Sequence, residues 1–462
     1  MKKNTAPVPL TEGNLFARII TFAIPVMLTN MLQMFLTTID NVVIGQFCGS
    51  DAVGALGCAI PIVSLLVNIL IGISTGAAVC IAQAIGSRNH RDVHETVHTA
   101  MTAALIFGAI FGILGFAVSR LALVWTNCPP EMMDGALMYL RIYFLGMPFA
   151  MFYNFGSAVL RAVGDSKRPL YYMLASGGAN VCFNLFFVIV CKMNIAGVAL
   201  GTIMSQFIAA ILVCRYLTGV NEIFKLEIKK MRIYGDKLRR ILRVGIPAAM
   251  QSSVYCVSNI IIQRSVNSLG PAVVTGTSAQ GNYEAFVSVA MTSIAQTAIT
   301  FVAQHMGAKK YKRMLRSVAV CVATVSVISL TLNGLIWVFR EPLLRVFIVD
   351  NEAAMKEAML RMAIICPFHI FCGILDVFSG SVQGLGASVS STVVSVAGTC
   401  GLRIIWILTV FRNATENLSL TLFAVYPVSW IVTLIAMMIL FFVVRHRIMK
   451  NDSPDDCESV KQ

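Results

Sequence analysis

The first half of this 462-residue chain is repeated in its second half, about 222 residues later. Three pairs of segments carry the repeat: Phe22–Pro25 with Val244–Pro247, Gln83–Arg88 with Gln304–Lys309, and Ala162–Ser166 with Gly384–Ser388. Almost every long segment of both halves is apolar. Such duplication in a polytopic membrane protein is typical of transporters, because two similar bundles can rock about a site between them. We therefore expect two related bundles of membrane-spanning helices.

Composition and segment length indicate the fold class. The chain is 57% hydrophobic and only 13% charged, whereas a soluble domain has about 25% charged residues. A membrane-spanning helix needs roughly 20 consecutive apolar residues. Segments of that kind lie at 15–44, 52–84, 94–118, 132–157, 169–190, 195–217, 238–266, 272–304, 314–338, 356–383, 388–411 and 417–445. The sequence therefore predicts an all-α polytopic membrane protein with twelve transmembrane helices in two pseudo-symmetric six-helix bundles, arranged as parallel repeats.

The distribution of Lys and Arg predicts the orientation. Basic residues gather in alternate loops, above all between Arg215 and Arg243, and enrichment in Lys and Arg marks cytoplasmic loops. Both termini are thus expected in the cytoplasm, and the protein in the cell inner (plasma) membrane. The expected divisions are a cytoplasmic segment 1–14, an N-terminal six-helix lobe 15–217, a basic cytoplasmic linker 218–237, a C-terminal six-helix lobe 238–446 and a disordered cytoplasmic tail 447–462.

Charged residues inside the apolar segments are the best pointer to function, because a carboxylate is costly in hydrocarbon. Three acids lie well inside predicted spans: Asp40, Glu284 and Asp376. Arg403 is the only base that clearly does, and Arg361 is expected in an outer loop. An interior rich in acids and poor in bases suits cations, which include a driving ion and a cationic substrate.

Asp40 is the first candidate site. Its potential partners are Asn180 and Asn184, which lie one helical turn apart on one face, and Thr202 on the following span. A carboxylate among amide and hydroxyl oxygens can hold a small hard cation such as Na⁺. It can also carry a proton, because its charge is costly to bury. The alternative is an Asp near the membrane interface that backbone groups or water satisfy.

The second half offers a further acidic site. Glu284 follows Tyr283 in a polar run inside an otherwise apolar segment, and it can bind a cationic substrate or change protonation during transport. The alternative is a carboxyl that is hydrogen-bonded to neighbouring helices. Asp376 can have a functional role or can pair with Arg403 as a structural lock. His369 is expected to be a satisfied core residue.

At these residues the chain closely resembles the multidrug and toxic compound extrusion (MATE) transporters over nearly its whole length. The matching segments are Leu10–Asn14, Asp40–Gly45, Gln83–Ser87, Arg161–Lys167 and Asn194–Ala199. The resemblance implies two six-helix lobes that form a V, and efflux of cationic, often aromatic compounds driven by a sodium or proton gradient. It also implies a cation site whose members are Asp40, Asn180, Asn184 and Thr202.

The chain departs from the family pattern at two positions. Asn184 stands where DinF-like relatives have a second Asp, so the site has one carboxylate and the choice between Na⁺ and H⁺ stays open. Tyr255 stands where NorM-like relatives have a Glu, although Asp376 is present. Glu284 resembles an acidic position of a bacterial MepA-like branch. Together with Tyr283, these positions are the candidates for a second acidic or substrate site.

Other functions fit the sequence less well. A lipid-linked precursor flippase or polysaccharide exporter of the same superfamily tends to have a cationic cavity, whereas the deep charges here are mostly acidic. A membrane-embedded enzyme would need a nucleophile with a base, or a metal cluster, and the sequence has neither pattern. It also has no ATP-binding signature. We expect an antiporter that needs no cofactor beyond its coupling ion. Its expected partners are small cationic drugs and the lipid bilayer, with no nucleic acid, and its expected state is monomeric.

Overall fold

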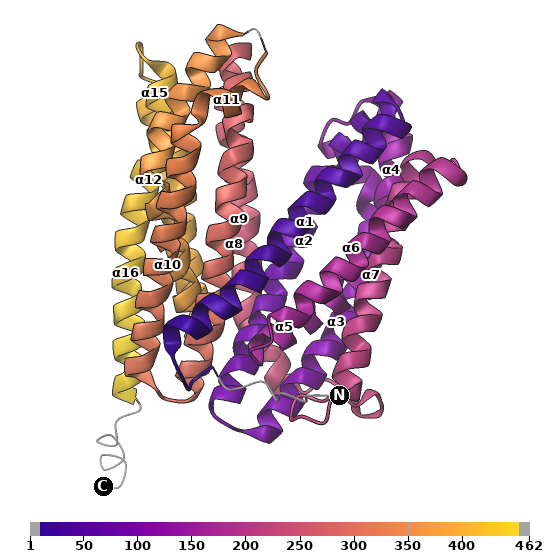
Figure 1. The fold of residues 1–462 in the computed structure, drawn as a ribbon, viewed down its shortest axis with the longest axis vertical. Coiled ribbons are helices and arrows are strands. Elements are labelled where there is room, and N and C mark those ends of the chain that lie inside the picture. Colours follow the sequence, from indigo (N-terminus) through magenta and orange to yellow (C-terminus); the bar gives the residue numbers. More distant parts are fainter. Residues whose placement is uncertain (1–9, 350, 452–462) are drawn as a thin grey trace. The chain divides into compact units, whose positions relative to one another are not determined.

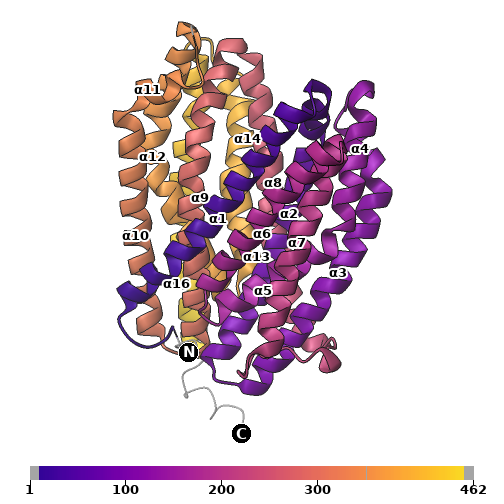
Figure 2. The ribbon, with the colours of Figure 1, turned by 45° about the vertical axis from the view of Figure 1, so that its right-hand side comes forward.

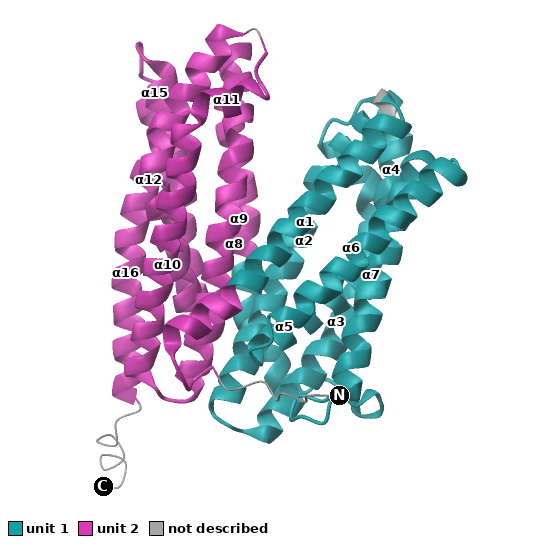
Figure 3. Ribbon diagram, in the orientation of Figure 1, with its two compact units in different colours: residues 1–9, 24–249 teal, residues 10–23, 250–462 magenta. Residues whose placement is uncertain are grey.

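The computed structural model of this protein describes residues 10–349 and 351–451, and over these residues all regular structure is helical (Figure 1). The described residues divide into two compact units (Figure 3). Unit 1 contains residues 24–249, and unit 2 contains residues 10–23 and 250–451. Two long helices, α1 (Leu15–Phe47) and α8 (Gly235–Ser268), therefore contribute residues to both units. Residues 1–9 of the expected N-terminal segment and residues 452–462 of the expected tail lie outside the described residues.

Unit 1 is a bundle of apolar helices. Besides its parts of α1 and α8 it contains α2 (Ser50–Gly86), α3 (His90–Trp125), α4 (Pro130–Leu145), α5 (Met147–Ala162), α6 (Lys167–Leu185), η1 (Phe186–Val190), α7 (Asn194–Gly219) and η2 (Ile228–Lys230). Helix α6 packs along α7, α3 along α5, and α2 along both α4 and α5. Asn89 starts α3 as an N-cap, because its side chain accepts a hydrogen bond from the Asp92 amide.

Unit 2 is built around one central helix. Its elements are α9 (Pro271–Gly307), α10 (Tyr311–Val338), α11 (Arg340–Arg345), α12 (Glu352–Gly384), α13 (Ser388–Ser395), η3 (Val396–Gly401), α14 (Leu402–Trp406), η4 (Ile407–Phe411), α15 (Leu418–Phe423) and α16 (Val425–Asn451). Helix α12 packs along α9, α10 and α16. Figure 2 shows the first turns of α1 beside α10.

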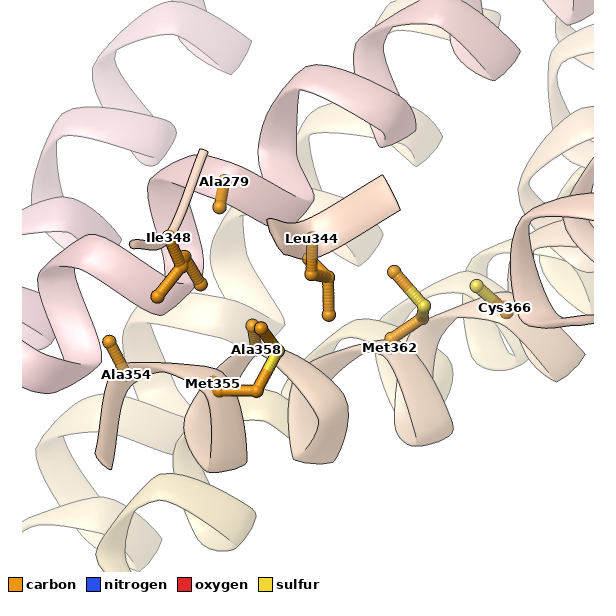
Figure 4. Close-up of a cluster of buried hydrophobic side chains, with 8 residues drawn as sticks. All are labelled: Ala279, Leu344, Ile348, Ala354, Met355, Ala358, Met362 and Cys366. Carbon is orange, nitrogen blue, oxygen red and sulfur yellow. The ribbon is translucent and has the colours of Figure 1, made fainter. Parts of the chain in front are cut away.

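Helices α9 and α12 and the segment that begins at α11 pack against one another through small and medium apolar side chains (Figure 4). The cluster contains Ala279, Leu344, Ile348, Ala354, Met355, Ala358, Met362 and Cys366. Gly276 permits the close approach of α9 to α12. A Cβ at this position would lie 2.6 Å from the carbonyl oxygen of Ala354 and 2.8 Å from the amide nitrogen of Ala358. The distance between the two helices therefore depends on a residue without a side chain.

The expected fold class is confirmed, with one difference in detail. Eleven described helices are long and apolar enough to cross a membrane, and one bent pair makes a possible twelfth span. The bent pair lies within the span that the sequence predicts over 132–157: α4 and α5 meet at an angle of 51°. Gly146 separates them and Pro148 occupies the first turn of α5. The chain bends here because Pro lacks a backbone N–H and its ring clashes with the preceding turn.

Several other helices differ from the expected spans in their regularity or length. The predicted span 388–411 alternates α-helical and π-helical turns, which are uncommon and weaken the regular hydrogen-bond ladder. Helix α16 continues to Asn451, so it includes the first residues of the expected tail. Hydropathy places the apolar centre of a span but is a weak guide to where the helix ends.

Gly276→Ala is expected to destabilise the protein, because the added methyl group overlaps the backbone of α12. Overpacking of this kind costs about 1–3 kcal/mol, so the apparent Tm of the detergent-solubilised protein should fall. Gly334→Ala on α10 is the matched control, since nothing lies within 4 Å of a Cβ there. Ala at an exposed helical position stabilises by up to ~1 kcal/mol relative to Gly. Equal Tm values for the two variants would contradict the close packing.

Candidate functional site

Three of the four residues expected around the first acidic site lie together in unit 1. Asp40 is on α1, and Asn180 and Asn184 lie one turn apart on α6. The Nδ2 of Asn184 donates hydrogen bonds to the Asp40 carboxylate at 2.6 Å and to the Asn180 Oδ1 at 3.3 Å. Both Asn side chains are buried. The Asn184 amide therefore holds the carboxylate in place, and Asn180 in turn orients Asn184.

The fourth residue, Thr202 on α7, faces the same cavity as Asp40 and Asn180. This cavity has a volume of about 310 Å³. The Thr202 hydroxyl donates to the carbonyl oxygen of Val198 at 3.0 Å, so its oxygen can still accept a hydrogen bond or coordinate an ion. Pockets that bind small ligands start near roughly 300 Å³. The cavity can therefore hold a partly hydrated ion or a small ligand group.

The Asp40 carboxylate has no basic partner. Among the described residues no Lys or Arg forms an ion pair with it, and the cavity lining contains neither residue type. A buried carboxylate that lacks a counter-charge is unstable in an apolar interior. Asp40 is half-buried at the cavity, and a bound cation or a proton can neutralise its charge. The carboxylate, amide and hydroxyl oxygens that surround the cavity are the ligand type that hard cations prefer.

The cavity wall also contains residues that the sequence analysis did not single out. Tyr139 and Tyr143 lie one turn apart on α4, and their rings stack with centroids 6.2 Å apart. Gln33 and Gln206 add amide groups to the wall. The spacing of the two tyrosines is a sequence signal for a shared helix face. It does not show that this face lines a cavity rather than the lipid.

Glu284 in unit 2 forms an ion pair that the sequence analysis did not predict. Its carboxylate lies 2.8 Å from the guanidinium of Arg361 on α12. The Arg361 side chain is buried, and it also donates hydrogen bonds to the Gln280 side chain and the Thr277 carbonyl oxygen. The expectation that Arg361 lies in an outer loop is wrong. Glu284 is therefore neutralised by a base of the same unit.

Helical periodicity could have revealed the position of Arg361. It lies on the same face of α12 as Ala354, Ala358 and Ile365, at intervals of three and four residues, and all of these are buried. An Arg inside such an apolar stripe points into the bundle. Arg361 lies close to the polar end of its predicted span, and for that reason it was expected in a loop.

The expected pair of Asp376 and Arg403 is not formed between these two described residues. The Arg403 Nε donates to the Ser429 hydroxyl on α16 at 3.2 Å. Its guanidinium lies 4.6 Å from the ring centroid of Tyr426. The reason is that α14 packs on α16, which directs the Arg403 side chain toward that helix. The proposed structural lock between the two charges is therefore wrong.

The other candidates of the second site are separated. Tyr255 lies in a polar network in which the Nε2 of Gln251 donates to the Tyr255 hydroxyl at 3.5 Å and to Ser379 at 3.4 Å. Asp376 lies one turn before Ser379 on α12. Within the described part of the chain, no hydrogen bond or ion pair joins Glu284 to Asp376 or Tyr255. The structure therefore does not assemble these residues into one site.

Tyr283 and His369 have structural contacts. The Tyr283 hydroxyl donates to the carbonyl oxygen of Leu343 at 2.8 Å. His369 is buried, has its ring nitrogens 3.4 Å from Ser288 and Asn333, and stacks on an aromatic ring of α16. This is the satisfied core position that we expect for His369.

The helices and the site define a class of protein. Two sets of apolar helices that are repeated in sequence, with a polar cavity inside one of them, are features of a multi-pass membrane transporter. The MatE family model matches residues 25–186 and, separately, residues 247–409. The chain therefore belongs to the MatE family, as the sequence resemblance implies, and it is a transporter rather than an enzyme.

Curated relatives extend over most of the chain. The probable multidrug resistance protein YpnP of Bacillus subtilis is 30% identical over 394 residues, which cover 85% of this chain and 88% of the relative. The probable multidrug resistance protein YoeA of the same organism is 26% identical over 424 residues, 90% of each chain. The multidrug export protein MepA of Staphylococcus haemolyticus is 19% identical over 405 residues, which cover 86% of this chain and 88% of the relative.

Solved structures share the fold. An outward-facing multidrug resistance MATE family transporter of the MOP superfamily matches with a TM-score of 0.88 at 17% sequence identity, covering 97% of this chain and 100% of that chain. The crystal structure of a MATE protein in the straight conformation matches with a TM-score of 0.86 at 18% identity, covering 97% of this chain and 99% of that chain. The fold is thus conserved at identities where side chains are mostly different.

Arg361→Gln is expected to destabilise unit 2, because it leaves Glu284 buried without a counter-charge. Breaking a buried pair from one side costs about 3–5 kcal/mol. The double variant Glu284→Gln with Arg361→Gln should recover part of the lost Tm, since it removes both charges. As a control, Arg345→Gln breaks an exposed pair with Glu341, which is worth about 0–1 kcal/mol. A double variant no more stable than Arg361→Gln alone would contradict this account.

Proposed function

We propose that this protein is a secondary active antiporter that exports cationic, often aromatic lipophilic compounds in exchange for Na⁺ or H⁺. The observation that carries the proposal is the Asp40 carboxylate. It accepts a hydrogen bond from the neutral amide of Asn184, lines a cavity of about 310 Å³ and has no basic partner among the described residues. Such a group must bind a cation or a proton, and exchange of that ion can be coupled to transport.

The proposed cycle is alternating access. A Na⁺ ion or a proton that enters from outside neutralises Asp40 and changes the packing of α1, α6 and α7, which carry the site. That change favours the conformation that releases the substrate outward. Coupling requires the ion and the substrate to differ in affinity for the two conformations, because a ligand with equal affinity for both shifts nothing.

The substrate class follows from the wall of the cavity and from the relatives. Stacked Tyr139 and Tyr143 and the nearby apolar side chains favour aromatic groups, and Asp40 favours a positive charge. The names of YpnP and MepA describe multidrug resistance and multidrug export. A flippase for phosphate-bearing lipids would need bases in the cavity, and its described lining has none. Glu284 is not part of the proposed substrate site, because Arg361 neutralises it.

We further propose that the protein works as a monomer in the cell inner membrane, with both termini in the cytoplasm and without nucleic acid partners. Alternate loops carry most of the basic residues, including the segment between α7 and α8, which is the pattern of cytoplasmic loops.

Asp40→Asn is expected to reduce coupled efflux by about 100-fold, because losing a charge-assisted interaction of about 3 kcal/mol weakens ion binding by that factor. The measurement is efflux of a fluorescent lipophilic cation from vesicles that contain the purified protein, with sodium and pH gradients imposed separately. The gradient that drives wild-type efflux identifies the coupling ion.

Asp134→Asn is the matched control for this experiment. Asp134 is an exposed acid on α4 that does not line the cavity, so this variant should transport at the wild-type rate. Both variants should reconstitute in equal amounts. Normal efflux by Asp40→Asn would exclude the assigned role of Asp40.

The orientation can be measured by cysteine labelling. In a cysteine-free variant that still transports, Lys229→Cys in the segment before α8 should react with a membrane-impermeant maleimide only after the cells are opened. Glu131→Cys at the start of α4 should react in intact cells. Both positions are exposed. The reverse pattern would contradict the proposed topology.

A further inference from the structure

Unit 2 contains a basic groove outside the transport cavity. It has a volume of about 710 Å³ and is lined by the first residues of α1 and the first turns of α10. Three bases of α10 line it: Lys312, Arg313 and Arg316. Apolar side chains complete the wall, among them Leu15, Phe16 and Val320. We call these six residues the basic groove.

The charges of the basic groove have no acidic partner among the described residues. Lys312 and Arg316 are exposed, lie one turn apart on α10, and form no ion pair or hydrogen bond with any described residue. Arg313 donates one hydrogen bond to the carbonyl oxygen of Gly13. Its Nε is buried in the groove region without a hydrogen-bond partner among the described residues. Three cations thus share one concave surface that has room for an anion.

An apolar surface continues from the groove along the same helix. Val320 lies one turn after Arg316, and the next turns of this face place Val327 and Leu330 on the surface, 64% and 60% exposed. Phe16, at the other side of the groove, is 61% exposed. A row of exposed apolar side chains on a membrane-spanning helix is the surface that lipid chains cover. The groove therefore joins an anion-binding region to a surface for hydrocarbon.

We propose that the basic groove binds one anionic phospholipid, with its phosphate headgroup on Lys312, Arg313 and Arg316 and an acyl chain along the exposed face of α10. Guanidinium groups form strong charge-assisted hydrogen bonds with phosphate oxygens. Basic pockets beside transmembrane helices are a known form of anionic lipid site. A zwitterionic headgroup is disfavoured, because its own ammonium group would meet three bases. Free phosphate would leave the apolar wall uncovered.

The bound lipid would also connect two parts of unit 2. The lining residues come from the start of α1 and from α10, and Arg313 already bridges them through Gly13. A headgroup between these segments adds contacts to both and holds the first turn of α1 against α10. This site needs neither Asp40 nor the transport cavity, so it does not depend on the proposed function.

The test compares lipid binding by the full-length protein in nonionic detergent. Dioleoylphosphatidylglycerol is titrated, and retained lipids are counted by native mass spectrometry, with dioleoylphosphatidylcholine and inorganic phosphate in parallel. The test variant is Lys312→Gln with Arg316→Gln, which leaves the Arg313–Gly13 contact intact. Each base near an anionic lipid contributes about fivefold in affinity, so this variant should bind phosphatidylglycerol roughly 25-fold more weakly.

The matched control is Arg239→Gln with Arg243→Gln on α8. These bases are also exposed, lie four residues apart on one helix and form no ion pair or hydrogen bond with a described residue, so the variant has the same change in net charge. We expect it to bind phosphatidylglycerol like the wild type, and phosphatidylcholine to bind weakly to all three proteins. Equal losses in both variants would indicate general charge attraction and overturn the site. Unchanged binding by the α10 variant, or displacement of the lipid by inorganic phosphate at equal concentration, would also overturn it.

Discussion

The cost of a carboxylate inside an apolar bundle is the constraint on which the site of unit 1 depends. An unpaired buried charge costs several kcal/mol, and Asp40 has only a neutral amide within hydrogen-bond distance, at 2.6 Å. Helix α6 presents Asn184 to Asp40 and Asn180 to Asn184, and the cavity beside them is where we propose that a neutralising ion or proton binds. In the proposed cycle, a bound ion or proton removes this cost, and the helices that carry the site, α1, α6 and α7, change their packing as a result.

The two halves share a sequence repeat but have diverged in their charges. At 222 residues after Asp40 stands Ile262, which is buried in an apolar cluster with Val266 and Val273. Unit 2 has two acids inside its spans: Glu284 is neutralised by Arg361 of the same unit, whereas Asp376 has no ion pair among the described residues. A charge that is paired within the protein has little need of an external cation. The helices are thus preserved in both halves of the repeat. The position of Asp40 in unit 1, however, is occupied by the apolar Ile262 in unit 2.

The helices were predictable because hydropathy and periodicity are local properties of the chain. The same periodicity placed Asn180 and Asn184 on one face of α6, and in the structure Asn184 bonds to Asp40 while Asn180 bonds to Asn184. A local break at Pro148 was predictable, but the sequence did not decide that the chain forms two helices bent by 51° there, because a Pro within an apolar segment is compatible with either a kinked or a broken helix. The role of Asp40 stays a prediction, since its geometry is compatible with either coupling ion.

The sequence by itself determined the apolar spans, the repeat, the family and the identity of the buried acids. Only the tertiary structure decided which of these acids has a base. Arg361 pairs with Glu284, whereas Arg403 contacts Ser429 and leaves Asp376 without an ion pair among the described residues. The physical reason is that spacing along a helix sets the face on which a side chain lies. Which partner it meets depends on how a different helix is rotated and packed against that face.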